Sequence, residues 1–216
     1  MMSRLGRIVV LCALTAVSGC SGRPGTMDAG TGDHLLLLAE DGTTPYSIVI
    51  AKEAPQTVTQ AATELAYFLN QMTGAEFVTR TDDTPESRFE IVLGPTNRKS
   101  LSDVPQKLRP QAWEGFVILP EDDKLYIMGG RIARGTLYGA YDFLEQELGV
   151  RFLAPQIHHV PHQPTLRARL TARVFNPTFE YRAHYPPSKQ RPGYSEWMTR
   201  QRLNSISIGS GHVRRL

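Results

Sequence analysis

Residues 129–145 read Gly129-Gly130-Arg131-Ile132-Ala133-Arg134-Gly135-Thr136-Leu137-Tyr138-Gly139-Ala140-Tyr141-Asp142-Phe143-Leu144-Glu145, and Gly149-Val150-Arg151-Phe152-Leu153-Ala154-Pro155 follows shortly after. The glycines at the start are typical of a strand that ends in a tight turn. Apolar residues then recur at helical spacing at Leu137, Tyr141, Leu144 and Leu148. Gly149 suits the left-handed residue that ends a helix. The stretch therefore predicts a strand, a glycine-rich turn and a helix over about Arg134 to Leu148.

The turn also has the glycine spacing of a phosphate-binding loop, with Thr136 directly after Gly135. The lysine that reaches the phosphates in such loops is absent, and so is the dinucleotide pattern G-x-G-x-x-G. We therefore interpret the turn as a structural feature that brings helix close to sheet, and we expect no cofactor. A nucleotide-binding domain built on residues 129–136 is an alternative. Arg131 and Arg134 could also pair with a carboxylate, on a neighbouring domain or on an acidic sugar.

The sequence before this stretch contains the other elements of a sheet covered by helices. Apolar residues at helical spacing follow Pro55 and stop at Gly74, which predicts a second amphipathic helix. A polar turn at 120–123 joins two apolar runs, 115–119 and 124–128, which predicts a hairpin. Further strands are expected at 46–51, 76–80 and 89–93, and 34–38 is an edge strand or the approach to one. We predict an α+β fold: a mixed β-sheet with two main helices on one face.

The first 33 residues predict export and a lipid anchor. Arg4 and Arg7 precede a short apolar run, which is typical of a secretory signal over residues 1–19. Val17-Ser18-Gly19-Cys20 resembles the bacterial lipobox, so Cys20 is the expected site of lipidation, and 20–33 the linker. An ordinary signal peptide is the alternative. We expect a membrane-anchored lipoprotein, periplasmic or at the cell surface.

Composition excludes several kinds of site. The only two cysteines are Cys12 and Cys20, so the folded part has no disulfide and no thiolate metal site. Loss of Arg4 and Arg7 lowers the formal net charge from +3 to +1, which gives no argument for nucleic acid. His158, His159 and His162 lie in a proline-flanked extended segment without metal-binding spacing. We expect a solvated or interdomain loop there, and no metal.

After residue 165 the pattern changes to that of a second domain. Residues 165–175 are a candidate strand, 179–182 a buried strand, 195–203 a helix and 206–209 a further strand. This order is that of the first β/α unit of a (β/α)₈ barrel, which needs about 250 residues when complete. We therefore predict an α+β domain over 34–165 and the start of an incomplete, truncated barrel over 166–216.

No pair of acids is placed for catalysis of glycoside hydrolysis, which needs two carboxylates held across a substrate. Asp82-Asp83, Asp122-Asp123 and Glu145 with Glu147 lie in turns or on a helix surface. We therefore assign no catalytic residue. Arg182, at the end of the expected first barrel strand, and the aromatic Tyr185 and Trp197 are candidates for substrate or interdomain contact, as is Arg134.

One block of sequence resembles a known family. Residues 114–118 (Glu114-Gly115-Phe116-Val117-Ile118), 125–130, 134–145 and 149–155 look like the N-terminal domain of family 67 α-glucuronidases, a domain type that also precedes the barrel of bacterial β-hexosaminidases. The resemblance covers about 45–165. It implies an α+β sandwich beside a catalytic barrel, whose acid and base come from later strands.

The resemblance and the residues together predict a non-catalytic accessory domain of a surface-anchored glycoside hydrolase-like protein. A carbohydrate substrate would be bound through the barrel. The alternative is a freestanding glycan-binding surface lipoprotein without hydrolase activity, which would use Trp197 or Tyr185. The sequence predicts no particular oligomeric state.

Overall fold

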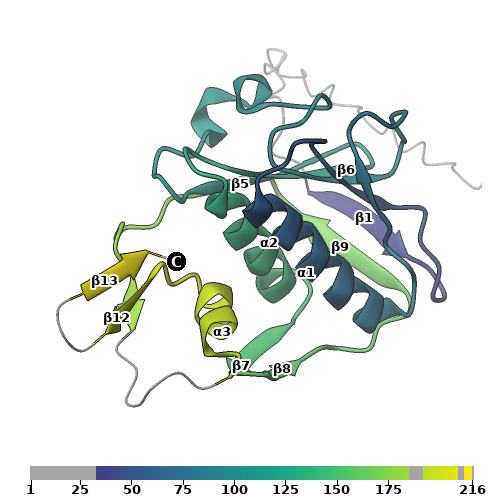
Figure 1. Ribbon diagram of the computed structural model, residues 1–216. Coiled ribbons are helices and arrows are strands. Elements are labelled where there is room, and N and C mark those ends of the chain that lie inside the picture. Colours follow the sequence, from purple (N-terminus) through teal and green to yellow (C-terminus); the bar gives the residue numbers. More distant parts are fainter. Residues whose placement is uncertain (1–32, 185–191, 209–211, 216) are drawn as a thin grey trace, which may run out of the picture.

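The computed structural model describes residues 33–184, 192–208 and 212–215 (Figure 1). The predicted signal peptide, Cys20, the linker as far as residue 32, and Tyr185 lie outside the described residues. Among the described helices, none has the length and apolar character needed to cross a membrane. The described chain forms an α+β domain, with a smaller unit against its helices (Figure 1).

A six-stranded mixed sheet forms the centre of the domain, as predicted. Its strand order is β10-β5-β6-β4-β2-β3. The pairs β2–β3, β2–β4 and β4–β6 are parallel, whereas β5 pairs with β6 as the predicted antiparallel hairpin. The strands are β2 (Ser47–Ile50), β3 (Thr79–Thr81), β4 (Glu90–Leu93), β5 (Phe116–Glu121), β6 (Lys124–Gly129) and β10 (Arg173–Phe175).

Two helices cover one face of this sheet, as expected. α1 (Gln56–Thr73) begins after Pro55 and ends at Gly74, whose φ of 78° is left-handed. α2 (Arg134–Gln146) stops two residues earlier than predicted. Their apolar sides pack together and on the sheet through one set of fully buried side chains, among them Ile48, Leu65, Phe68, Leu69, Ile91, Ile127, Leu137 and Tyr141.

The other face of the sheet is also covered. The segment between β4 and β5 crosses it and contains two short 3₁₀ helices, η1 (Leu101–Asp103) and η2 (Gln106–Leu108). A second apolar cluster lies beneath this segment. Because both faces are covered, every residue of β2 and β4 is buried, and these strands lack the alternation of a strand with one wet face.

The predicted strand at 76–80 is shorter and lies later than expected. Only Thr79–Thr81 pair with β2. Phe77 instead donates its backbone N–H to the side-chain oxygen of Asn70 on α1 at 2.8 Å, and its ring is buried in the core. The bond to the helix takes the place of a ladder hydrogen bond and delays the start of the strand.

The chain returns to the domain after residue 165. β9 (Leu166–Leu170) pairs with β1 (His34–Ala39) in a separate two-stranded antiparallel sheet, and β10 joins the edge of the main sheet. The first strand is therefore not an edge strand of the main sheet. The boundary predicted between 165 and 166 does not coincide with the end of the sheet, because 166–175 hydrogen-bond to strands of the N-terminal unit.

A short hairpin carries the predicted histidine segment. β7 (Arg151–Ala154) pairs with β8 (Ile157–His159), so the segment is partly a strand rather than only a loop. The ring of His158 packs edge-on against Phe68, with 5.3 Å between centroids. Among the described residues, no three His, Cys, Asp or Glu side chains are grouped to hold a metal ion.

The smaller unit has the predicted order of strand, helix and strand. β11 (Ala183–His184) pairs in parallel with β12 (Ser205–Ile208), and α3 (Tyr194–Arg200) lies between them in sequence. β13 (His212–Arg215) runs antiparallel to β12, which differs from the all-parallel arrangement of a barrel. The strand–helix–strand order is thus as expected, whereas the barrel stays a prediction.

The buried strand predicted at 179–182 is wrong. Phe179 is 72% exposed and Tyr181 is 49% exposed. The backbone of Arg182 is bound to Asn204 by two hydrogen bonds. The N–H of Arg182 donates to the side-chain oxygen of Asn204, and the backbone N–H of Asn204 donates to the carbonyl oxygen of Arg182. The β ladder therefore begins only at Ala183.

Candidate functional site

The glycine-rich turn is a point of close backbone approach. A Cβ added at Gly135 would collide with the carbonyl oxygen of Gly115 and would lie 2.9 Å from the Cα of Gly129. A Cβ at Gly129 would lie 2.6 Å from the amide nitrogen of Thr136. Because only glycine fits these positions, the start of α2 can lie directly on the ends of β5 and β6.

The groups that would hold a phosphate are bound within the protein. The N–H of Gly129 donates to the hydroxyl of Thr136 at 2.8 Å, and the N–H of Gly130 donates to the carbonyl of Gly115 at 2.7 Å. The N–H of Thr136 donates to the carbonyl of Ala133 at 3.0 Å. A phosphate loop needs these N–H groups free and aimed at the ligand, so the structural interpretation of the turn is supported.

The carboxylate of Glu114 is the centre of the site. Glu114 directly precedes β5 and is buried, with 6% of its surface exposed. Its Oε1 accepts from Arg134 at 2.9 Å, and its Oε2 accepts from Arg182 at 2.6 Å and from the side-chain amide of Asn204 at 2.7 Å. Three donors from three parts of the chain thus satisfy one buried charge, which lowers the cost of its burial.

Arg182 is held on all sides. Its guanidinium donates to the carbonyl oxygens of Arg202 at 2.8 Å and Phe179 at 2.7 Å, in addition to Glu114, and it lies over the ring of Tyr138. It directly precedes β11, so it lies at the N-terminal end of that strand. The sequence left substrate contact and interdomain contact open for Arg182, and its ion pair with Glu114 is a contact with the α+β domain.

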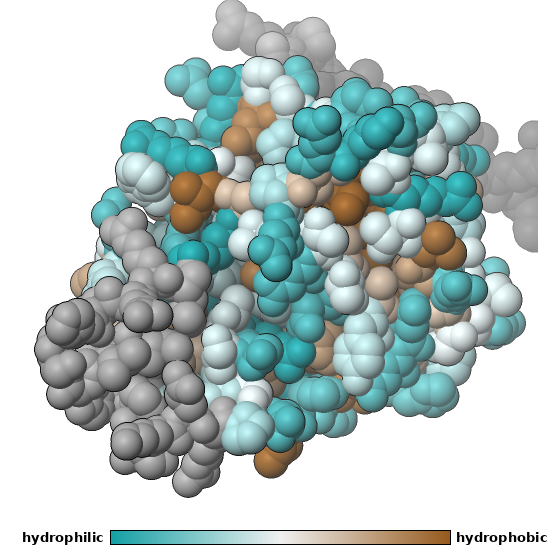
Figure 2. Space-filling model, viewed as in Figure 1, coloured by the Kyte–Doolittle hydropathy of each residue, from teal (hydrophilic) through white to brown (hydrophobic). Residues whose placement is uncertain are grey.

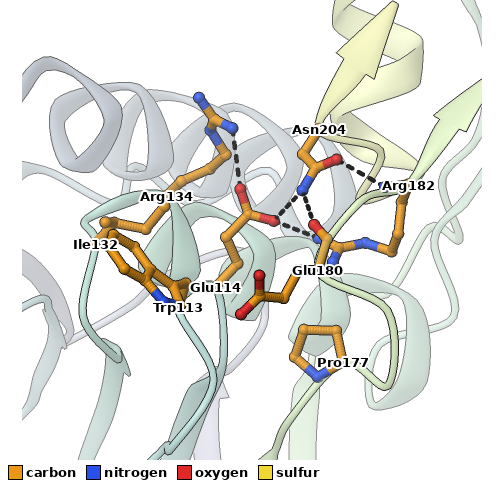
Figure 3. A pocket seen from close by; sticks show the side chains of 8 residues that line it. All are labelled: Trp113, Glu114, Ile132, Arg134, Pro177, Glu180, Arg182 and Asn204. Carbon is orange, nitrogen blue, oxygen red and sulfur yellow. Dashed lines mark hydrogen bonds and ion pairs between the residues drawn. The ribbon is translucent and has the colours of Figure 1, made fainter. Parts of the chain in front are cut away.

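A pocket of about 200 Å³ opens beside this network (Figure 3). Glu180 points into it from the segment before β11 and is exposed, and its side chain has no hydrogen bond or ion pair with any described residue. Trp113 forms another wall and is 49% exposed. The eight lining residues are Trp113, Glu114, Ile132, Arg134, Pro177, Glu180, Arg182 and Asn204.

A second ion pair joins α3 to α1. Arg200 donates two hydrogen bonds to Glu64, at 2.9 and 3.0 Å, and its guanidinium lies over the rings of Phe68 and Phe152. Burial lowers the pKa of Arg200, but hydrogen bonds and the charge of Glu64 outweigh burial and raise its pKa overall. The paired geometry fixes the direction of α3 as well as its distance from α1.

A third group of ion pairs lies at the C-terminal end of α2. Arg202 donates to Glu145 at 2.7 Å, and Arg173 on β10 donates to Asp142 at 2.6 Å and to Glu147 at 3.0 Å. The acids at this end of α2 are therefore partners of arginines.

The acids predicted to lie in turns have structural partners too. Asp82 accepts from the backbone N–H groups of Lys52 and Asn97, and Asp123 pairs with Arg88. These contacts hold loops at the ends of strands, and neither carboxylate lines the pocket.

Trp197 packs against the α+β domain. Its indole N–H donates to the carbonyl of Phe152 at 3.0 Å, and its ring is half-buried against the core. The side chain of Gln201 donates to the same carbonyl at 2.7 Å. Within the described chain, the contacts of Trp197 are with the α+β domain. Arg134 contacts Glu114 of its own domain.

Ionisation of Tyr138 should weaken the contact between the α+β domain and the smaller unit at alkaline pH. Tyr138 is buried and donates its hydroxyl to the carbonyl of Leu203 at 2.9 Å. Burial, aided by the charge of Glu114, raises the pKa of Tyr138 from 10.0 to about 12. A raised pKa means that this stabilisation is complete below pH 10 and is lost as the pH rises toward 12. We expect the free energy of unfolding to fall by about 2 kcal/mol over that range because of this group.

Urea unfolding at a series of pH values measures this loss. Tyr138→Phe is the matched control, since it lacks the ionisable hydroxyl. The variant should be less stable at neutral pH but should lose less stability than the wild type above pH 10. Equal losses in both proteins would contradict the assignment.

The α+β domain is similar to domains of known proteins. Residues 38–143 match the model of the glycosyl hydrolase family 67 N-terminus. The fold is similar to that of a β-hexosaminidase from Streptomyces plicatus, with a TM-score of 0.52 and 14% identity over 82% of this chain and 32% of that one. No curated protein matches this chain.

A second solved structure has the same fold. The family GH115 4-O-methyl-α-glucuronidase BtGH115A matches with a TM-score of 0.51 and 17% identity, over 81% of this chain and 25% of that one. This chain therefore spans about a third or less of the length of either enzyme. The residues that match the family model include α1, strands β2 to β6 and most of α2. The α+β domain of this chain is thus similar to the N-terminal domain of family 67 glycosyl hydrolases, and its fold is similar to parts of two other glycoside hydrolases.

Proposed function

We propose that this domain is a non-catalytic accessory domain of a glycoside hydrolase-like protein, and that it holds the start of the following domain in a fixed position. The observation that carries the proposal is the position of Glu114. Its carboxylate binds Arg182 and Asn204 of the following unit and Arg134 of α2 at once. A buried charge with partners on both units favours a single relative orientation.

The remaining contacts agree with a supporting role. The ion pairs of Arg200 and Arg202 and the hydrogen bonds of Trp197 and Tyr138 all cross between the α+β domain and the smaller unit. The polar groups of the pocket are mostly bound to one another, with Glu180 as the exception. In this proposal the sugar is bound by a barrel domain, whose first unit begins at β11.

We further propose that the protein is exported and attached to a bacterial membrane through Cys20. The support is the sequence of the first 20 residues, with its basic start, apolar run and Val17-Ser18-Gly19-Cys20. A lipid chain contributes membrane affinity of about 0.8 kcal/mol for each buried methylene.

The alternative of a freestanding glycan-binding lipoprotein has less support. It would use Trp197 or Tyr185 as stacking platforms. The indole N–H of Trp197 is bound and its ring is half-buried, whereas a sugar-stacking ring needs an open face. Saturable binding to a polysaccharide that is lost on Trp197→Ala would favour this alternative.

An activity assay tests the accessory role. We expect the purified chain over residues 21–216 to hydrolyse neither aryl glycosides nor an aldouronic substrate, because none of the described residues places a second free carboxylate beside Glu180 in the pocket. Glu180→Gln serves as the control for contaminating enzymes. Turnover by the wild type that disappears in Glu180→Gln would show a catalytic site in this chain and overturn the proposal.

A further inference from the structure

The two-stranded sheet β1–β9 has an outer face with an unusual composition. Leu35 and Leu37 of β1 are 59% and 36% exposed. In the antiparallel register Leu35 lies opposite Arg169, and Leu37 lies opposite Arg167. Both arginines are exposed. Two leucines and two arginines thus form one small outward surface, which we call the β1–β9 face.

The fold does not require leucine at these positions. The alternate residues Leu36 and Leu38 point inward and are buried, as are Ala168 and Leu170 of β9. This inner side packs on the main apolar cluster and stabilises the two strands. A polar residue at 35 or 37 would leave that packing intact, so the packing of the domain does not account for leucine at these positions.

The β1–β9 face lies away from the smaller unit. Figure 1 shows β1 and β9 on one side of α1, whereas α3, β12 and β13 lie beyond α2 on the other side. A domain that continues from the smaller unit would therefore grow from the opposite side of the molecule.

The position of the face in the chain points to its partner. Thirteen residues, 21–33, separate Cys20 from the start of β1. Even when fully extended, such a segment spans no more than about 50 Å. We propose that the β1–β9 face rests on the phospholipid surface to which Cys20 is attached, an inference that depends on the lipid anchor proposed above.

The residue types fit this surface. Leucine side chains enter the boundary between headgroups and acyl chains, and arginine guanidinium groups bind lipid phosphates in pairs of hydrogen bonds. Asp33 pairs with Arg169 at 3.5 Å, but both side chains are exposed. Such an ion pair is weak, so a lipid phosphate can replace Asp33 as the partner of Arg169. Glu40 and Asp41 follow β1 and mark the end of the face.

Depth-dependent quenching of a fluorescent label tests the inference. The lipidated full chain with the substitution Leu35→Cys is labelled at position 35 with an environment-sensitive dye. It is then bound to vesicles of phosphatidylethanolamine and phosphatidylglycerol. Ile157→Cys is the matched control, because Ile157 is also 59% exposed and lies on a strand of the β7–β8 hairpin. Lipids with a quencher on the acyl chain should reduce emission severalfold more at position 35 than at position 157.

The arginines are tested in the same assay. Arg167→Gln with Arg169→Gln should weaken quenching at position 35 while the protein stays with the vesicles through its anchor. Equal, weak quenching at positions 35 and 157 in vesicle-bound protein would overturn the proposal that the β1–β9 face rests on the lipid, but not the proposal of a lipid anchor. Protein that remains in the supernatant would overturn both, since the face depends on the anchor.

Discussion

Glu114→Ala lowers the free energy of unfolding by roughly 3 kcal/mol, because it leaves Arg134 and Arg182 as partly buried cations without their shared carboxylate. The estimate is at the lower end of the range for buried pairs, since each guanidinium side chain is still 19% exposed. Asn204 loses an acceptor at the same time. The smaller unit should therefore loosen before the α+β domain unfolds.

Urea unfolding and hydrogen exchange together measure this effect. Exchange of the Asn204 amide, which donates to the Arg182 carbonyl at 3.0 Å, should accelerate more than exchange within α1. Glu180→Gln is the control, since it changes an unpaired acid of the same pocket and should alter stability by less than about 0.5 kcal/mol. Equal stabilities for Glu114→Ala and Glu180→Gln would contradict the role given to Glu114.

Gly135→Ala is expected to destabilise the domain by about 3 kcal/mol, at the upper end of the range for overpacking. The new methyl group would meet the backbone of Gly115 and Gly129, and backbone atoms cannot move aside as the end of a side chain can. The start of α2 would have to move away from the sheet. The expected loss follows from close packing and does not involve any ligand.

Gly139→Ala on the same helix gives the comparison for this prediction. Its methyl group would meet the side chains of Ile127, at 2.6 Å, and Phe116, at 3.2 Å, which can shift. Both glycines lie in α2, and alanine in place of glycine gains up to about 1 kcal/mol of helix propensity in either case, so the comparison depends on what the new methyl group meets. Thermal unfolding should therefore rank Gly139→Ala well above Gly135→Ala in stability. The reverse order, or a Gly135→Ala protein as stable as the wild type, would contradict the close approach.

Local patterns predicted the parts of the fold that depend on neighbouring residues. The periodicity after Pro55 and after Arg134 gave both helices, and the turn at 120–123 gave the β5–β6 hairpin. The missing lysine of the phosphate-loop pattern led to a structural interpretation of the turn, which the hydrogen bonds of Gly129 and Gly130 support.

Features that depend on distant residues were not predicted. Glu114 has partners 20, 68 and 90 positions away, so nothing in its neighbourhood marks it as the centre of a network. The pairing of β9 with β1 joins two strands that are more than a hundred residues apart in the sequence. The alternation Phe179-Glu180-Tyr181-Arg182 resembles a strand. The backbone of Arg182 is bound to Asn204, however, and the β ladder starts at Ala183, directly after the predicted strand.

The size of the native protein tests the accessory role most directly. An antibody raised against residues 34–175, which include both helices and the main sheet, would be used to blot membranes from the source organism. The account predicts a band several hundred residues larger than 216, with room for the catalytic domain that this domain supports. A single band at the size of residues 20–216 would contradict it and would favour a freestanding lipoprotein.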